Sequence, residues 1–282
     1  MSIIESIILG IVQGLSEFLP ISSSAHVTLA GKWMNVVPKD HPEHWTAFIA
    51  VIQLGTLISI LIYFSKDIIN ITNDFFRDNF KLKLQYGEQS INSRLGWMIA
   101  VGTIPIIVAG LMMKELIEGS LTKNLYLISI SLIVFALILA VAEKAAEHKR
   151  NMKELRLADS LLIGIAQAFA LIPGASRSGT TITGGLFVGL KRSDAARFSF
   201  LLSIPAVFTS AFFELYRAFQ FLNMSVVVDL LVATVASAVS GYIAIDFLLK
   251  YLKKHSTYVF IFYRIILGIL IIVLLLTNTF KP

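Results

Sequence analysis

The sequence predicts an all-α polytopic membrane protein organised as an inverted repeat, with six transmembrane helices and two re-entrant helical hairpins. The first reason is composition: the 282 residues are 56% hydrophobic and 15% charged, as in integral membrane proteins. The second is that apolar runs of roughly 20 residues, the length that crosses a hydrocarbon core, recur along the chain. The third is a pair of similar polar turns, one in each half of the sequence.

Six apolar runs predict the transmembrane helices. They lie near residues 46–64, 95–113, 125–142, 198–216, 227–249 and 258–277. Because the bilayer core offers no water to backbone N–H and C=O groups, each run must satisfy these groups internally, as a helix does. The runs lack the alternation of period two that a membrane barrel requires, so a helical fold is expected.

Two shorter segments, residues 3–37 and 159–190, predict the hairpins. Their arms are residues 3–19 and 24–37 in the first segment and residues 159–172 and 179–190 in the second. At roughly 1.5 Å per residue these arms reach about 18–25 Å, less than the roughly 30 Å hydrocarbon core. We therefore expect them to enter the membrane and return, with both turns facing an internal cavity. Eight full spans are the alternative.

The two hairpins begin the two halves of the predicted repeat, residues 1–150 and 155–282. Gly10-Ile-Val-Gln in the first half matches Gly164-Ile-Ala-Gln in the second, and each hairpin is followed by three spans. One hairpin plus three spans makes an odd number of crossings, so the second half should be inverted relative to the first. Inverted repeats place their binding site near the bilayer midplane.

Basic residues predict the orientation. The loops at 65–94, 143–158, 191–197 and 250–257 hold 16 of the 24 Lys and Arg residues, whereas the opposite side holds six. By the positive-inside rule these loops are expected to be cytoplasmic, and both termini are expected on the outer face of the bacterial inner membrane. The net charge of +6 is scattered over these connectors, so nucleic acid is not an expected partner. The absence of cysteine excludes disulfides, thiolate metal sites and a cysteine nucleophile.

The first polar turn carries a carboxylate, hydroxyls and a histidine. Gln13 and Glu17 are four residues apart, so they share one face of a helix that leads into Ser22, Ser23 and, farther on, His26. A carboxylate within a membrane segment is costly and indicates function by default. The structural alternative is that Glu17 caps the second arm or pairs with Arg177 to hold the hairpins together.

The second polar turn, residues 173–181, is typical of an anion cradle. Arg177 supplies a fixed charge whose fork suits phosphate oxygens. The helix that follows presents free N–H groups. The other candidate phosphate-binding residues allow close backbone approach or donate from a hydroxyl: Gly174, Ser176, Ser178 and Thr181.

Together the two turns indicate phosphoryl transfer. Arg177 would neutralise the equatorial phosphate oxygens. Ser23 or a water molecule could be the nucleophile, with His26 or Glu17 accepting its proton, and direct attack by His26 is the alternative. Glu17 with Gln13 could hold Mg²⁺ or Ca²⁺, because hard cations prefer oxygen ligands and bridge diphosphate oxygens.

The residues from Gln13 to His26 and from Pro173 to Thr181 closely resemble the motifs of the undecaprenyl-diphosphate phosphatases, the bacitracin-resistance family. The resemblance covers essentially the whole chain. It implies divalent-cation-dependent hydrolysis of undecaprenyl diphosphate to undecaprenyl phosphate and inorganic phosphate, at a site open to the outer face. This reaction recycles the lipid carrier of peptidoglycan synthesis and protects against bacitracin.

The chain departs from the family pattern at three positions. Gln13 stands where many relatives have glutamate, and Ser24 and Ala25 stand where threonine and glycine are frequent. Because an amide lacks the charge of a carboxylate, Gln13 weakens the expected metal binding.

Several further interpretations concern alternative functions, isolated polar residues and the oligomeric state. A polyprenyl-phosphate transporter or flippase is the main alternative, since inverted repeats with broken helices are also typical of transporters. Unrelated lipid phosphatases use lysine, arginine and two histidines, but only His26 lies near the turns. Gln53 is expected to face the cavity as a substrate-binding residue, with a helix-to-helix hydrogen bond as the alternative. Arg264 is expected to snorkel or to pair with Asp246. A homodimer is also considered.

Overall fold

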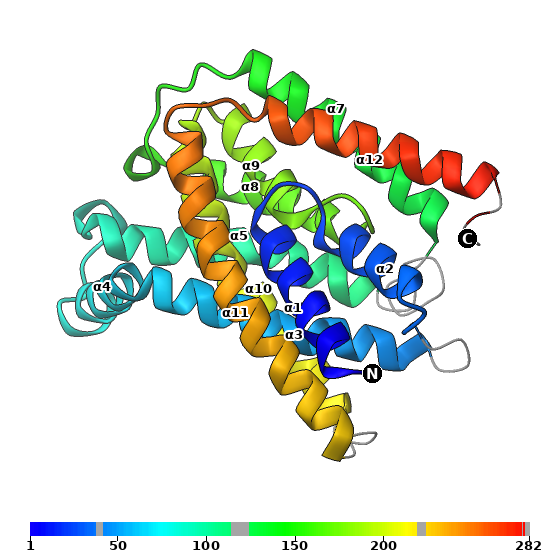
Figure 1. The fold of residues 1–282 in the computed structure, drawn as a ribbon. Helices are drawn as coiled ribbons and strands as arrows, with labels where there is room; N and C mark the ends of the chain where they lie inside the picture. The colour runs from blue at the N-terminus through cyan, green and yellow to red at the C-terminus, as the bar shows by residue number, and fades with distance from the viewer. Residues whose placement is uncertain (38–41, 114–123, 219–223, 278, 280–282) are drawn as a thin grey trace.

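The computed structural model describes residues 1–37, 42–113, 124–218, 224–277 and 279. Within these residues every regular element is helical apart from an isolated bridge between Arg150 and Leu190. The α-helices are α1 (Ile3–Phe18), α2 (Ser23–Trp33), α3 (Pro42–Tyr63), α4 (Ser65–Phe76), α5 (Ile91–Met112), α7 (Leu125–Ala145), α8 (Leu157–Ala168), α9 (Arg177–Phe187), α10 (Arg192–Ala218), α11 (Met224–Leu252) and α12 (Tyr258–Leu276) (Figure 1). The short elements are η1 (Arg77–Lys81), η2 (Tyr86–Glu88), η4 (Met152–Glu154) and η5 (Phe169–Leu171).

The described helices confirm an all-α membrane protein. The segments long and apolar enough to cross a membrane are Ile91–Met112, Leu125–Ala145, Arg192–Phe213, Val227–Leu252 and Tyr258–Leu276. These five correspond to the last five predicted spans.

The predicted span at 46–64 differs from the others. Phe48–Tyr63 meets the same criteria only together with Ser65–Lys81, and the two are bent by 74°. The helix breaks at Phe64, whose φ of −99° and ψ of 18° lie outside the helical region. Counted as one broken span, the pair brings the number of candidate spans to six.

Two pairs of short helices lie between the long ones. Helices α1 and α2 have 16 and 11 residues, and α8 and α9 have 12 and 11. Each helix is shorter than the roughly 20 residues that cross a hydrocarbon core. The helix limits match the predicted arms to within a few residues, and each pair is joined by one of the two polar turns.

Glycines let the first helix of each short pair approach a long helix from the other half of the chain. In α1, a Cβ at Gly14 would meet the Ser240 hydroxyl of α11, and a Cβ at Gly10 would meet the backbone of the same helix. In α8, a Cβ at Gly164 would meet the backbone of Gly102 in α5. Such close contacts between small residues are typical of helix packing in membranes. Helices of the two halves of the chain therefore pack directly against each other, α1 against α11 and α8 against α5.

Arg150 joins the ends of α8 and α9 that lie away from their polar turn. Its guanidinium donates to the Val188 carbonyl at 2.7 Å, just after α9, and to the Asp159 carboxylate at 2.5 Å, in the first turn of α8. The bond to Asp159 raises the pKa of Arg150 above its ordinary value. This contact fixes the two helices at the end opposite to their polar turn.

Candidate active site

The two polar turns have the same local structure. Ser22 precedes α2 with φ of 78°, and Ser176 precedes α9 with φ of 70°. The Ser22 hydroxyl accepts from the Ala25 N–H at 3.4 Å, and the Ser176 hydroxyl accepts from the Gly179 N–H at 3.2 Å. Each serine is thus an N-cap that leaves other N–H groups of the first helical turn available to an anion.

The turns also bond to each other. The Gly174 N–H donates to the Ser24 hydroxyl at 3.3 Å, and the Ser178 hydroxyl donates to the Leu19 carbonyl at 3.0 Å. Both contacts join residues about half the chain apart. The structure therefore brings the two turns together, as the sequence predicted for two halves of one site.

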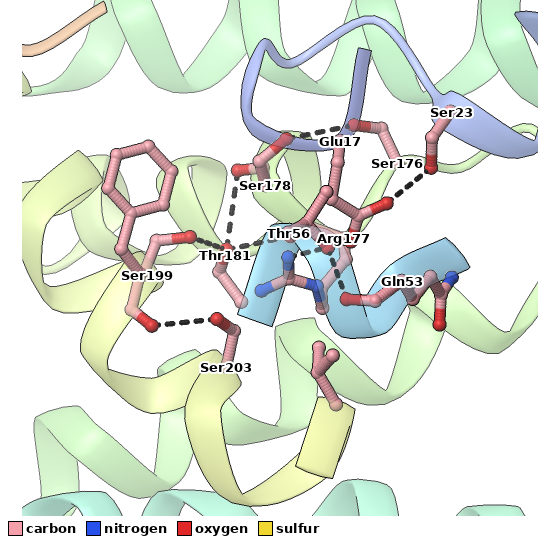
Figure 2. A network of polar contacts seen from close by, with 12 residues as sticks. Glu17, Ser23, Gln53, Thr56, Ser176, Arg177, Ser178, Thr181, Ser199 and Ser203 are labelled. Atoms are coloured by element: carbon pink, nitrogen blue, oxygen red, sulfur yellow. Dashed lines mark hydrogen bonds and ion pairs between the residues drawn. The ribbon is translucent and has the colours of Figure 1, made fainter. Parts of the chain in front are cut away.

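Glu17 lies at the centre of this contact (Figure 2). Its Oε2 accepts from the Ser23 hydroxyl at 2.6 Å and from Gln13 Nε2 at 2.9 Å, and its Oε1 accepts from Arg177 Nη2 at 2.8 Å. The Glu17 residue is only 6% exposed. Three donors satisfy the buried carboxylate, and one of them carries the positive charge that compensates it. Four predicted site residues thus meet at one carboxylate.

Two buried atoms beside Glu17 have no hydrogen-bond partner within the described part of the chain. They are the donor Arg177 Nη1 and the acceptor Gln13 Oε1. A buried polar atom without a partner is costly, so its presence calls for an explanation. One vacant donor and one vacant acceptor suit a ligand with phosphate oxygens and an associated cation.

The donor set fits a divalent cation only in part. Glu17 and Gln13 offer hard oxygen ligands. Among the described residues, however, no group of three or more His, Cys, Asp or Glu side chains could hold a metal ion. A cation here would need further ligands from a diphosphate and from water.

His26 forms a hydrogen bond with Tyr263, and within the described residues it forms none with the Ser23 hydroxyl. His26 Nδ1 is 2.7 Å from the Ser22 carbonyl, and Nε2 is 2.7 Å from the Tyr263 hydroxyl. Because a carbonyl only accepts, Nδ1 carries the hydrogen, and Nε2 of the neutral ring accepts from Tyr263. Ser23 instead donates to Glu17. Tyr263 belongs to a long apolar run, so no sequence signal marked it.

The remaining predicted residues occupy the edge of the network. The buried Thr181 hydroxyl donates to the Arg177 carbonyl at 2.7 Å and also bonds to the Ser199 hydroxyl of α10. Gln53 of α3 is drawn in Figure 2, where its carbonyl accepts from Thr56 at 2.7 Å. Its amide makes no hydrogen bond to the described site residues. The substrate-binding roles of Thr181 and Gln53 stay predictions.

Gly174→Ala is expected to destabilise the fold by about 1–3 kcal/mol. Gly174 has φ of 89°, and a Cβ there would meet the backbone carbonyl of Ile128 in α7. The melting temperature in detergent measures the effect. Gly110→Ala is the matched control, because no atom lies within 4 Å of a Cβ at Gly110. Equal melting temperatures for the two variants would contradict this account of the turn.

Comparison with known proteins shows a match along almost the whole chain. A model of the family described as bacitracin resistance protein BacA matches residues 6–270. An undecaprenyl-diphosphatase of Syntrophobacter fumaroxidans is 53% identical over 268 residues, which cover 95% of each chain. An undecaprenyl-diphosphatase of Myxococcus xanthus is 48% identical over 282 residues, covering 100% of this chain and 92% of the relative.

Proposed function

Because the chain belongs to the bacitracin resistance protein BacA family, we propose that it is an undecaprenyl-diphosphatase. It removes the terminal phosphate of undecaprenyl diphosphate, leaving undecaprenyl phosphate and inorganic phosphate, and so returns the lipid carrier to peptidoglycan synthesis and protects against bacitracin. The observation that carries this proposal is the meeting of Glu17, Ser23 and Arg177 in one network.

The first chemical step in this proposal is attack by Ser23. Its oxygen forms a bond to the terminal phosphorus while its proton passes to Glu17, to which it already donates at 2.6 Å. The bond between that phosphorus and the bridging oxygen breaks, and undecaprenyl phosphate leaves with the electron pair. Arg177 Nη1, which has no hydrogen-bond partner among the described residues, donates to an equatorial oxygen and stabilises the developing charge.

The second step restores the enzyme. A water molecule attacks the phosphorus of the phosphoserine, and the bond between phosphorus and Ser23 breaks. Glu17 returns its proton to the serine oxygen. The inorganic phosphate leaves with the oxygen and both hydrogens of the water molecule. Direct attack of water on the diphosphate is the competing route, and it needs Glu17 but not Ser23.

Divalent Mg²⁺ or Ca²⁺ is the proposed cofactor. Gln13 Oε1 and the Glu17 carboxylate would hold it together with diphosphate oxygens, and the vacancy at Gln13 Oε1 supports this arrangement. Such an ion neutralises charge on the diphosphate. Gln13 itself holds Glu17 in place through its Nε2 group.

We also propose that the two halves form an inverted repeat, residues 1–150 and 155–282, with re-entrant hairpins at 3–37 and 159–190. The equal geometry of the two turns and the shortness of the four helices support this arrangement. The distribution of basic residues supports an orientation with both termini outside. The entry of the first hairpin from that side, together with the family resemblance, supports a site open to the outer face. A reporter at Pro282 that responds as cytoplasmic would contradict this orientation.

Phosphate release by the purified protein in detergent tests the function. With undecaprenyl diphosphate and Mg²⁺ or Ca²⁺, we expect one inorganic phosphate per lipid converted, and we expect a chelator to stop the release. A protein that binds the lipid but releases no phosphate would favour the transporter alternative.

Ser23→Ala and His26→Ala should separate the candidate nucleophiles. We expect Ser23→Ala to lower kcat about 10³-fold or more. His26→Ala should lower it about 10- to 100-fold, because His26 already bonds to Ser22 and Tyr263. Phosphate release measures both, and acid-stable phosphate trapped on the wild type should map to Ser23. A loss with His26→Ala as large as that with Ser23→Ala would reject the proposed step.

A further inference from the structure

Arg264 of α12 is a fully buried charge that touches the second polar turn. Its Nη2 donates to the Ala175 carbonyl at 2.9 Å and to the Gly174 carbonyl at 3.1 Å. The expectation that Arg264 snorkels or pairs with Asp246 is wrong, because the side chain is 0% exposed and Asp246 bonds to Lys250 at 2.7 Å. The turn, and not an acidic residue, holds this guanidinium in the interior.

The burial of Arg264 is costly and little compensated. Within the described residues it makes no ion pair, and its Nε and Nη1 atoms have no hydrogen-bond partner. An uncompensated charge among membrane helices is unfavourable for stability and indicates a functional role. One nitrogen of the rigid guanidinium, Nη2, engages both adjacent carbonyls, and a lysine ammonium on its flexible stem lacks this fixed geometry.

The two bonded carbonyls belong to the segment that aims Arg177. Gly174 and Ser176 both lie in the left-handed region, with φ of 89° and 70°. The carbonyls between these two bends are held by Arg264, and the next residue, Arg177, begins α9. A shift of this segment would therefore move Arg177 relative to Glu17.

Gly179 makes room for this arrangement. A Cβ at Gly179 would stand 2.7 Å from Arg264 Nη1, too close for the guanidinium to keep its position. The glycine and the arginine therefore fit together beneath the start of α9. A Gly179→Ala substitution would therefore displace the Arg264 guanidinium without removing its charge.

We propose that Arg264 is a positioning residue for the hydrolysis: it fixes the Gly174 and Ala175 carbonyls so that Arg177 faces the terminal phosphate. This inference rests on the proposed function. Helix α12 also carries Tyr263, which bonds to His26 of the first turn. Consecutive residues of one helix thus contact both turns of the site.

Arg264→Lys and Gly179→Ala test the proposal, with Arg192→Lys as the matched control. Arg192 pairs with the buried acid Glu143 and contacts neither turn. We expect both test variants to lower kcat about 10- to 100-fold, the size of effect seen when catalytic groups are misplaced, while KM changes less than about threefold. They should also bind inorganic phosphate more weakly than the wild type, as titration calorimetry would measure.

The melting temperature separates positioning from folding. If the test variants keep the melting temperature of the Arg192→Lys control but lose kcat and phosphate affinity, the positioning role is supported. If they melt lower while kcat per folded molecule and phosphate affinity match the wild type, Arg264 is structural and the proposal is refuted. A wild type that releases no phosphate would refute the proposed function instead, and phosphate affinity would still decide the role of Arg264.

Discussion

Arg177→Ala is expected to lower kcat for phosphate release by about 10³- to 10⁵-fold, the range found for arginines that stabilise phosphoryl transfer. The physical reason is that the transition state spreads charge over the equatorial oxygens, and Arg177 Nη1 is a buried donor without a partner among the described residues. Assays on purified protein in detergent, at saturating lipid and divalent cation, measure the loss.

Two further variants serve as controls for Arg177→Ala. Arg177→Lys keeps the charge but loses the fork, so it should recover only part of the activity. Arg197→Ala removes an arginine that pairs with Asp67 at 2.6 Å, outside the two turns, and should leave kcat nearly unchanged. Near-normal turnover by Arg177→Ala would reject the assignment of the second turn.

Glu17→Gln is expected to lower kcat about 10²- to 10⁴-fold, the range for loss of a positioned acid or base. The amide nearly keeps the shape of the side chain but loses its charge. The amide can neither accept the proton of Ser23 nor compensate the positive charge of Arg177. The Glu17 carboxylate forms hydrogen bonds with both of these residues. Phosphate release per folded molecule measures the effect, and the melting temperature checks folding.

Asp246→Asn is the matched control for Glu17→Gln. Asp246 pairs with Lys250 at 2.7 Å and lies outside the two turns, so its conversion to an amide should leave kcat nearly unchanged. If Glu17→Gln kept most of its activity, Glu17 would only hold the two turns together, and another group would accept the proton.

The sequence alone could predict the parts of the site that are carried by short, local patterns. Glu17 and Arg177 stood out because charges are rare in apolar segments, and their similar surroundings indicated that the two turns meet. The ion pair between them confirms that the turns meet. The helix limits followed from the positions of the two polar turns between the apolar arms.

Contacts between distant segments could not be predicted in this way. Tyr263 and Arg264 lie in one apolar run, and only the packing of α12 shows that one contacts His26 and the other Gly174. The bend at Phe64 was also missed, because neither proline nor glycine marks it and the apolar run continues up to it. Tertiary packing decides such features, and a single sequence does not record it.

A double-variant cycle on Glu17 and Arg177 tests most directly whether the two turns form one hydrolytic site. Phosphate release from undecaprenyl diphosphate would be measured for the wild type, Glu17→Gln, Arg177→Lys and the double variant. If Glu17 and Arg177 act together in the same transfer of the terminal phosphate, the double variant should lose less than the product of the two single losses. Losses that multiply, or a wild type that releases no phosphate, would contradict the account.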